Sequence, residues 1–198
     1  LDPGQGEAWV DGVDLGTLTQ EELYEVRRNV GYVFQFAALF DSLTIEDNVG
    51  LGLRRIPEMT AEAIRGRVRE CLDLVELDGY QDRYPAQLSG GQKKRAGLAR
   101  AIATQPDYLL YDEPTTGLDP VTTTVIDRLI IRTREELKVT SLVITHDMTS
   151  AYRVADRIGM LYDGVIRFMG TPEEIQSCED PVVKGFIEGK PELLEGAG

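Results

Sequence analysis

The sequence predicts an α/β protein built around a mostly parallel sheet, and three observations carry this prediction. Short apolar runs alternate with longer segments whose apolar residues recur at helical spacing. Polar side chains follow the apolar runs directly, as they do where parallel strands end at a ligand site. The 198 residues, of which 42% are hydrophobic, are enough for one domain with a sizeable core.

The N-terminal part of the chain predicts a hairpin followed by a short helix. Residues Gly6–Leu15 contain two short strand-like runs on either side of an Asp11-Gly12 turn. Thr19 and Glu22 have the spacing of a capping box. A helix should therefore begin there and continue to Arg28.

The first core strand is expected over Asn29–Phe34, where an apolar run predicts a buried strand that ends at Gln35. A glutamine at a strand end is most often an ordinary polar loop residue. Thr44 then stands where it can cap a helix that continues to Val49. A second helix is expected over Thr60–Glu76, and we interpret its apolar face as core packing. That face consists of Ile64, Val68, Leu72 and Val75.

The middle of the chain reads LSGGQKKRAGLARAIATQPDYLLYDEPTTGLDP. It contains two segments whose residue types are suited to ligand binding or catalysis. In the first, Ser89 and Gln92 have capping-box spacing, which predicts a helix that continues to about Thr104. Gly90 and Gly91 allow an anion to come close to the backbone. The free N–H groups and partial positive charge of a helix N-terminus suit a phosphate.

The second segment is an apolar run, Tyr108–Tyr111, which predicts a short buried strand. Asp112 and Glu113 end the run. One carboxylate at such a strand end can hold Mg²⁺, which prefers oxygen ligands and retained waters. The next can orient or deprotonate a water for attack on a phosphate. Each segment alone is common in ordinary loops.

The C-terminal third predicts further helices and strands. Pro120–Leu137 should form a helix with proline at its first position, and Ser141–Thr145 another buried strand. His146, the only histidine in the chain, follows that strand; a lone histidine is more often structural than catalytic. The remaining expectations are a helix over Asp147–Ala155, a hairpin of Ile158–Tyr162 and Val165–Gly170, a helix capped at Thr171, a helical segment over Pro181–Ile187 and a mobile end over Lys190–Gly198.

The bulk composition excludes several classes of function. The net charge is 21 − 34 = −13, which argues against binding nucleic acid or anionic lipid through a broad basic face. Cys71 and Cys178 are far apart in sequence and form no CxxC pair, so a reduced cytoplasmic setting is the default. No apolar run approaches the length of a membrane span, so any membrane role should come through partner proteins.

In this order and spacing the motifs resemble those of ABC-type ATPases. Leu88–Gln92 is similar to the signature motif, Tyr108–Glu113 to the Walker B motif and Gly117–Asp119 to the D-loop. Gln35 matches the position of the Q-loop glutamine and His146 that of the switch histidine. The resemblance covers nearly all of the chain. It implies a P-loop NTPase-like fold with antiparallel hairpins and a helical subdomain, about residues 36–104, inserted in one α/β domain with a C-terminal tail over about residues 180–198.

The resemblance also implies a mechanism. Two ATPase subunits would form a homodimer around two ATP molecules, and Ser89, Gly90, Gly91 and Gln92 of one subunit would face the γ-phosphate held by the other. Asp112 would bind Mg²⁺ and Glu113 would polarise the attacking water. Gln35, which touches both Mg²⁺ and that water, and His146 would complete the catalytic site, and Asp119 would couple the two sites. Membrane-spanning permease subunits would place the protein on the inner face of the cytoplasmic membrane.

One expected motif is absent. The family binds ATP through a phosphate-binding loop, GxxxxGK[ST], and no such loop occurs in the chain. The nearest match, Gly185–Pro191, has the wrong spacing and a proline in place of the hydroxyl residue. We expect N-terminal truncation of a longer ATPase rather than natural loss of the motif, and an isolated fragment that is inactive.

The segment Ala38–Ile45, followed by Asn48-Val49, is similar to ATPases of Mce-associated transporters, including Mla-type phospholipid systems. Asp119–Val121 and Asp180–Ile187 are similar too. This resemblance implies lipid transport with an Mce-type substrate-binding protein as a possible partner. The alternatives are an ATPase of an amino-acid or other small-solute importer, a soluble ABC ATPase outside transport, and a non-catalytic structural subunit. The intact Glu113 argues against the last, and the sequence specifies neither cargo nor direction.

Overall fold

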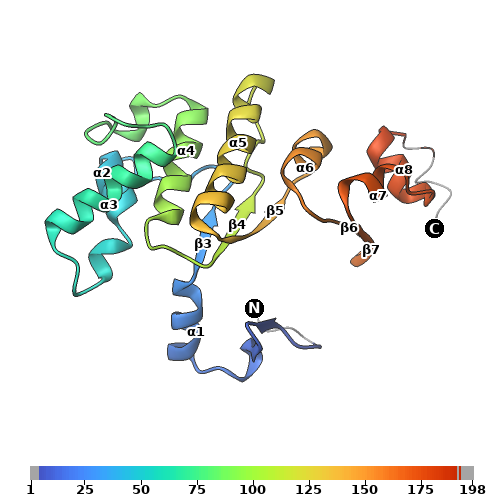
Figure 1. Ribbon diagram of the computed structural model, residues 1–198, viewed down its shortest axis with the longest axis horizontal. Helices are drawn as coiled ribbons and strands as arrows, with labels where there is room; N and C mark the ends of the chain where they lie inside the picture. The colour runs from blue at the N-terminus through green and yellow to red at the C-terminus, as the bar shows by residue number, and fades with distance from the viewer. Residues whose placement is uncertain (1–4, 191, 193–198) are drawn as a thin grey trace.

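The computed structural model describes residues 5–190 and 192, and its centre is a three-stranded parallel sheet in the order β3-β4-β5 (Figure 1). The three strands are β3 (Val30–Val33), β4 (Tyr108–Asp112) and β5 (Thr140–Ile144). Two antiparallel hairpins lie outside this sheet, β1 (Trp9–Val10) with β2 (Val13–Asp14) and β6 (Ile158–Tyr162) with β7 (Val165–Gly170). The predicted α/β class, with a parallel core and antiparallel hairpins, is confirmed.

Local capping explains where the helices begin. Each α-helix in the described part of the chain follows a Ser, Thr or Asp whose side chain accepts a hydrogen bond from the first turn. No helix among the described residues is long and apolar enough to cross a membrane. The helices are α1 (Gln20–Arg28), α2 (Ile45–Gly50), α3 (Ala61–Leu74), α4 (Gly90–Ile102), α5 (Pro120–Leu137), α6 (Met148–Val154), α7 (Pro172–Gln176) and α8 (Pro181–Glu188), with short 3₁₀ turns at Leu15–Thr17, Leu53–Arg55 and Pro85–Gln87.

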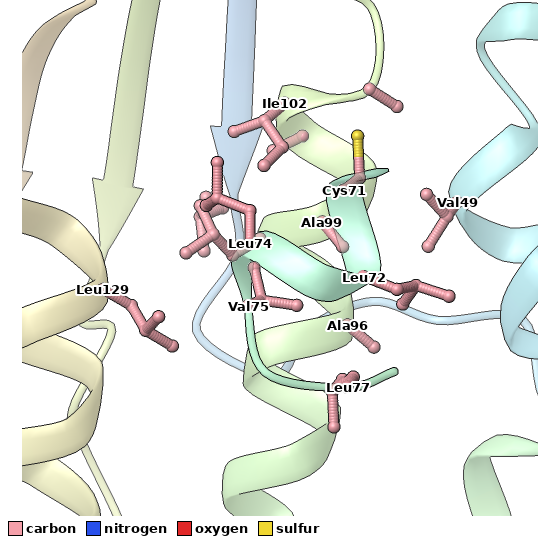
Figure 2. Packing of buried hydrophobic residues seen from close by; sticks show 14 of the residues in the cluster. Val49, Cys71, Leu72, Leu74, Val75, Leu77, Ala96, Ala99, Ile102 and Leu129 are labelled. Atoms are coloured by element: carbon pink, nitrogen blue, oxygen red, sulfur yellow. The ribbon is translucent and has the colours of Figure 1, made fainter. Parts of the chain in front are cut away.

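The main hydrophobic core lies between the helices α2 to α5 and one face of the sheet. Figure 2 shows Leu72 and Val75 of the α3 region beside Ala96 and Ala99 of α4, and all four belong to the main core. The predicted apolar face of α3 is confirmed, because Val68, Leu72 and Val75 are completely buried and Ile64 packs against them. This packing seats α4 between the α2–α3 pair and the sheet (Figure 1).

The prediction that the core strands are buried is wrong for one face of the sheet. Alternate residues of β3 and β4, including Val33, Leu109 and Tyr111, are buried in the core. The other face leaves apolar side chains between 41 and 56% exposed; they are Tyr32, Phe34, Leu142 and Ile144. A short apolar run shows that both faces could be covered, but it does not reveal whether a second layer is present. Parallel sheets are normally covered on both faces.

A smaller core joins the second hairpin to the C-terminal helices, through Met160, Ile175, Val182 and Val183. The elements predicted for this region are all present. The near match to a phosphate-binding loop falls in α8 and its left-handed cap at Gly189, not between a strand and a helix. The predicted mobile end, residues 190–198, lies outside the described residues except for 190 and 192.

Candidate active site

The carboxyl ends of the three parallel strands bring the predicted catalytic residues to one edge of the sheet. β3 ends two residues before Gln35, β4 ends in Asp112, and β5 ends two residues before His146. Asp112 pairs in register with Ile144 of β5. The Glu113 N–H then donates to the Ile144 carbonyl at 3.0 Å, which extends the ladder by one residue. This pairing explains how residues 33 positions apart in sequence become neighbours.

Glu113 and His146 form the central contact of this edge. The Glu113 Oε1 lies 2.9 Å from the His146 Nδ1, and the Thr116 hydroxyl donates to Oε2 at 2.7 Å. Burial raises the pKa of Glu113, but the hydrogen bonds from His146 and Thr116 outweigh it and hold the pKa below its ordinary value. The same hydrogen bond raises the pKa of His146. The geometry thus keeps the carboxylate ionised, which a proton-accepting base requires.

The backbone at Glu113 has an uncommon conformation. Its φ is +46°, in the left-handed region that non-glycine residues seldom adopt. The Lys94 ammonium, on α4, donates to the carbonyl oxygens of Glu113 at 3.2 Å and Thr116 at 2.8 Å. The turn after β4 is therefore held from the helix side as well as from the β5 side.

Asp112 is placed as a candidate Mg²⁺ ligand would be. Within residues 5–190, the one hydrogen bond to its Oδ2 is a long one, 3.4 Å, from the Tyr32 hydroxyl. Among the described residues no group of three acidic, histidine or cysteine side chains could hold a metal ion alone. A single carboxylate at a strand end fits Mg²⁺ that arrives with nucleotide phosphates, because Mg²⁺ commonly binds one or two carboxylates plus phosphate oxygens.

Gln35 begins a turn whose backbone is held against α4. Ala37 and Ala38 both have positive φ, +60° and +48°. The Arg100 guanidinium donates to both of their carbonyl oxygens, at 2.8 Å and 2.6 Å. A Cβ at Gly97 would lie 3.2 Å from Ala37, so α4 and this turn are in close contact. The predicted sensor glutamine therefore precedes a turn that α4 fixes.

The predicted phosphate-facing helix end is built as expected in one respect and differs in another. Ser89 caps α4 and forms the capping box with Gln92, with hydrogen bonds of 2.9 Å and 3.3 Å. Ser89 and Gly90 are exposed, so a ligand can reach them. Gly91 is buried, and a Cβ there would lie 2.5 Å from the Thr122 methyl group. Close packing on α5 therefore explains Gly91 in this structure better than the approach of an anion.

Asp119 caps the helix that packs against α4. Its Oδ1 accepts hydrogen bonds from the Val121 and Thr122 N–H groups, both at 3.0 Å, at the start of α5. The Thr122 hydroxyl also bonds to the carboxylate, and these hydrogen bonds lower the pKa of Asp119. The structure thus gives this residue a structural task that the motif match did not include.

Three side chains that hold the edge were not identified from the sequence, namely Lys94, Arg100 and Thr116. The two cations stand six residues apart in the same helix, α4. Their contacts are with backbone oxygens distant in sequence, and no local pattern encodes such contacts. Thr116 lies three residues after Glu113, so its spacing alone was the available signal.

Comparison with known protein families and proteins gives consistent matches. A family model described as "ABC transporter" matches residues 1–116. The probable ribonucleotide transport ATP-binding protein mkl of Mycobacterium leprae is 38% identical over 190 residues, which cover 96% of this chain and 55% of that protein. The intermembrane phospholipid transport system ATP-binding protein MlaF of Haemophilus influenzae is 40% identical, with coverage of 96% and 72%. The chain thus spans about half the length of the mkl protein.

Solved structures and other relatives extend the comparison. The dimeric ATP-binding cassette MJ0796 in a post-hydrolysis state with ADP and Pi superposes with a TM-score of 0.75 at 36% identity, covering 85% of this chain and 74% of that one. Relatives of comparable identity carry other transport names. A sulfate/thiosulfate import protein of Bacillus cereus is 41% identical, and a glycine betaine/carnitine transport protein of Listeria monocytogenes is 43% identical, covering 53% and 48% of those proteins and 96% and 95% of this chain.

Proposed function

Because the chain belongs to the ABC transporter family of ATP-binding proteins, we propose that it forms part of an ATP-hydrolysing transport subunit. The observation that carries this proposal is the contact between Glu113 and His146 at the ends of two adjacent parallel strands. A carboxylate kept ionised beside an exposed imidazole can accept a proton from water, while the imidazole faces an incoming phosphate.

In this function the residues at the sheet edge divide the tasks. Glu113 accepts the proton of the attacking water, and His146 donates a hydrogen bond toward the γ-phosphate. Asp112 and Gln35 would hold the metal that accompanies the nucleotide. When bound, Mg-ATP would supply the phosphoryl group and its metal would neutralise charge on the phosphate oxygens. The long, weak contact of Asp112 with Tyr32 supports its availability for this task.

The exposed end of α4 supports a contribution in trans. We propose that Ser89, Gly90, Gly91 and Gln92 face the phosphate of a nucleotide held by a second copy of the subunit. The N-cap of α4 is open to solvent at Ser89 and Gly90, and free N–H groups at a helix N-terminus attract anions. Asp119 would lie at the same dimer contact, since its α5 helix packs beside α4 through Thr122. The MJ0796 relative is dimeric, which supports this arrangement.

ATP binding in this function requires a phosphate-binding loop, and the exposed apolar face of the sheet supports a proposal for its location. We propose that a segment outside the 198 residues carries this loop and packs on the face formed by Tyr32, Phe34, Leu142 and Ile144. Parallel sheets are normally covered on both faces, and the sheet edge next to this face holds Asp112 and Glu113. A nucleotide held there would meet both carboxylates.

We further propose that the transported substrate is a phospholipid, in a system of the Mla type with membrane-spanning permease subunits and an Mce-type protein. The support is the Ala38–Ile45 segment and the MlaF relative, of which this chain covers 72%. The subunit would then sit on the inner face of the cytoplasmic membrane. A small-solute importer is the second candidate, because sulfate and betaine transport relatives are equally similar.

The replacement Glu113→Gln in the natural protein tests the proposed activity. Glutamine keeps the shape and the hydrogen bond from Thr116 but cannot accept the proton. We expect Mg-ATP turnover to fall by at least about 10², while the dissociation constant for Mg-ATP stays within a few-fold. Arg128→Gln, at an exposed position of α5, is the control and should retain turnover. Unchanged turnover in Glu113→Gln would remove Glu113 from the base role.

A further inference from the structure

The Lys94 side chain of helix α4 hydrogen-bonds to the backbone of the catalytic turn. Lys94 is partly buried, and its ammonium donates to the backbone oxygens of Glu113 and Thr116 at 3.2 Å and 2.8 Å. The two oxygens lie at the two ends of the turn that follows β4. One cation therefore spans the segment that carries the Glu113 side chain.

This contact falls where the backbone needs support. The φ of +46° at Glu113 belongs to a region that a residue with a β-carbon occupies only when its surroundings hold it there. On one side the Glu113 N–H is fixed to Ile144 of β5. On the other side Lys94 holds the carbonyl oxygen. Relaxation of φ would rotate the side chain away from His146.

The target of the ammonium is also informative. Within the described residues Lys94 bonds to main-chain oxygens and forms no ion pair with the Glu113 carboxylate. An ammonium paired with the carboxylate would stabilise its ionised form but would also compete with water for its lone pairs. By binding the backbone instead, Lys94 leaves both carboxylate oxygens to Thr116 and His146.

We propose that Lys94 is a positioning residue, which holds the left-handed turn at Glu113 so that the carboxylate stays beside His146 and faces the attacking water. The inference deepens the proposed ATPase function and rests on it for its catalytic consequence. Lys94 stands on the helix that begins at Ser89. A shift of α4 on ligand binding at its N-terminus would therefore move the turn that carries the base.

Three variants separate this role from a general loss of charge or of stability. Lys94→Met removes the donors and keeps most of the side-chain length. Lys94→Arg keeps several N–H donors at a similar reach and should retain the hydrogen bonds that hold the turn. Lys93→Met makes the same charge change one residue away on the same helix, and Lys93 has no side-chain hydrogen bond within the described residues. It is the matched control.

The first measurement is the pKa of His146, determined by NMR titration. The imidazole signal of His146 is assigned by its loss in His146→Gln. Two carboxylates, on Glu113 and Asp147, raise this pKa in the wild type. Loss of the Lys94 charge alone would raise the pKa further, because a nearby cation disfavours protonation. Displacement of Glu113 would instead lower it. The sign of the change therefore distinguishes movement from charge.

We expect Lys94→Met to lower the His146 pKa by about half a unit or more, while Lys94→Arg and Lys93→Met stay near the wild type. Only variants whose amide NMR signals outside residues 113–118 match those of the wild type are compared. This condition is needed because an unfolded chain would also give an ordinary histidine pKa. If Lys94→Met does not fold, Lys94→Gln, which shortens the reach but retains a donor, takes its place with the same expected sign.

The second measurement is Mg-ATP turnover. We expect Lys94→Met to lower kcat by at least about tenfold, with KM changed less than threefold, because the base is misplaced while nucleotide contacts remain. An unchanged or raised His146 pKa together with unchanged kcat would overturn the inference. If the wild type does not hydrolyse ATP, the proposed function fails, and the His146 titration still decides whether Lys94 holds Glu113.

Discussion

At the scale of single residues, the candidate site depends on a carboxylate and an imidazole that change each other's protonation. His146 is 70% exposed and Glu113 is 19% exposed, so water screens the pair from one side only. Their hydrogen bond raises the pKa of His146 and helps to hold that of Glu113 below its ordinary value. An ion pair this exposed contributes at most about 1 kcal/mol to stability, so its importance lies in orientation and charge.

The sign of both shifts predicts how the contribution of this pair varies with pH. The contribution of Glu113 to the free energy of unfolding is fully present above 4.5, its pKa in the unfolded state. It is lost as the pH falls through the lower pKa of the folded state. The His146 part is present below the unfolded pKa of 6.5 and is lost as pH rises through the higher folded pKa. We expect the difference in unfolding free energy between the wild type and Glu113→Gln to be largest between these two pH values.

Urea unfolding measured from pH 4 to pH 8 (about the range that brackets both groups) tests this expectation. The difference should shrink toward both ends of the range. The difference in unfolding free energy between the wild type and His146→Gln should decline in the same way at the alkaline end. A difference that keeps growing above pH 7 (roughly half a unit past the ordinary histidine pKa) would show that the pair is not ionic in the folded protein.

The residues of this pair could be identified from the sequence because each follows an apolar run at the position of a motif of the resembled family. A strand end is a local feature, and parallel strands end at a common edge. The supporting contacts could not be predicted. Lys94 and Arg100 bind backbone oxygens 19 to 63 residues away, and a backbone oxygen leaves no trace in the identity of its residue.

At the scale of elements, helix starts and the buried face of α3 were predictable, whereas the backbone contacts of Lys94 and Arg100 on α4 were not. Ser, Thr or Asp caps act within one turn, so the starts of α1 and α4 could be predicted from Thr19 and Ser89. The burial of the strands was overestimated. An apolar run has the same composition whether one or both faces are covered, and β5 has exposed side chains at Leu142 and Ile144.

The packing of α4 on α5 gives a prediction that separates two adjacent glycines. A Cβ at Gly91 would lie 2.5 Å from the Thr122 methyl group, whereas one at Gly90 would lie 3.9 Å from the nearest atom, on Leu118. We expect Gly91→Ala to lower the unfolding free energy by about 1–3 kcal/mol, as overpacking does. Gly90→Ala should be neutral or slightly stabilising, because alanine favours the helix.

Denaturant unfolding of both variants checks this pair of expectations. Thr122→Ser removes the methyl group that Gly91→Ala would meet and keeps the hydroxyl that bonds to Asp119. In the double variant, Thr122→Ser should therefore recover most of the unfolding free energy that Gly91→Ala removes. Equal destabilisation by both alanines, or no recovery with Thr122→Ser, would contradict close packing as the reason for glycine at position 91.

At the scale of the whole molecule, exposed apolar side chains gather in separate places. One group is the uncovered sheet face. A second lies on the β6–β7 hairpin, where Leu161, Val165, Ile166 and Met169 are exposed. A third lies on the turn after Gln35, where Phe36 is 85% and Phe40 52% exposed. The net charge of −13 leaves apolar contact as the more favourable way to bind a partner near an anionic membrane.

Phe36–Leu53 contains the segment that is similar to Mce-associated ATPases, and burial separates the residues of this segment that could dock a membrane-spanning subunit from those that could not. Ile45 is fully buried and Leu39 packs against the core, so neither can serve as a free contact. Phe36 and Phe40 project from a turn that Arg100 fixes through Ala37. Rigid exposed aromatic groups are effective anchors at interfaces.

We predict that Phe36→Asp and Phe40→Asp in the natural protein abolish co-purification with its membrane-spanning partner, while ATP turnover of the isolated subunit changes less than threefold. The physical reason is that a carboxylate at the centre of an apolar contact is desolvated without a partner, which costs more than the lost ring contact alone. Phe186→Asp, a matched change at the exposed Phe186 of α8, should keep the complex. Retention of the complex by both turn variants would exclude this turn as the docking surface.

Mass spectrometry of the wild-type complex decides the transport class in the same experiment. An Mce-type component would support lipid transport, and a solute-importer permease alone would overturn it.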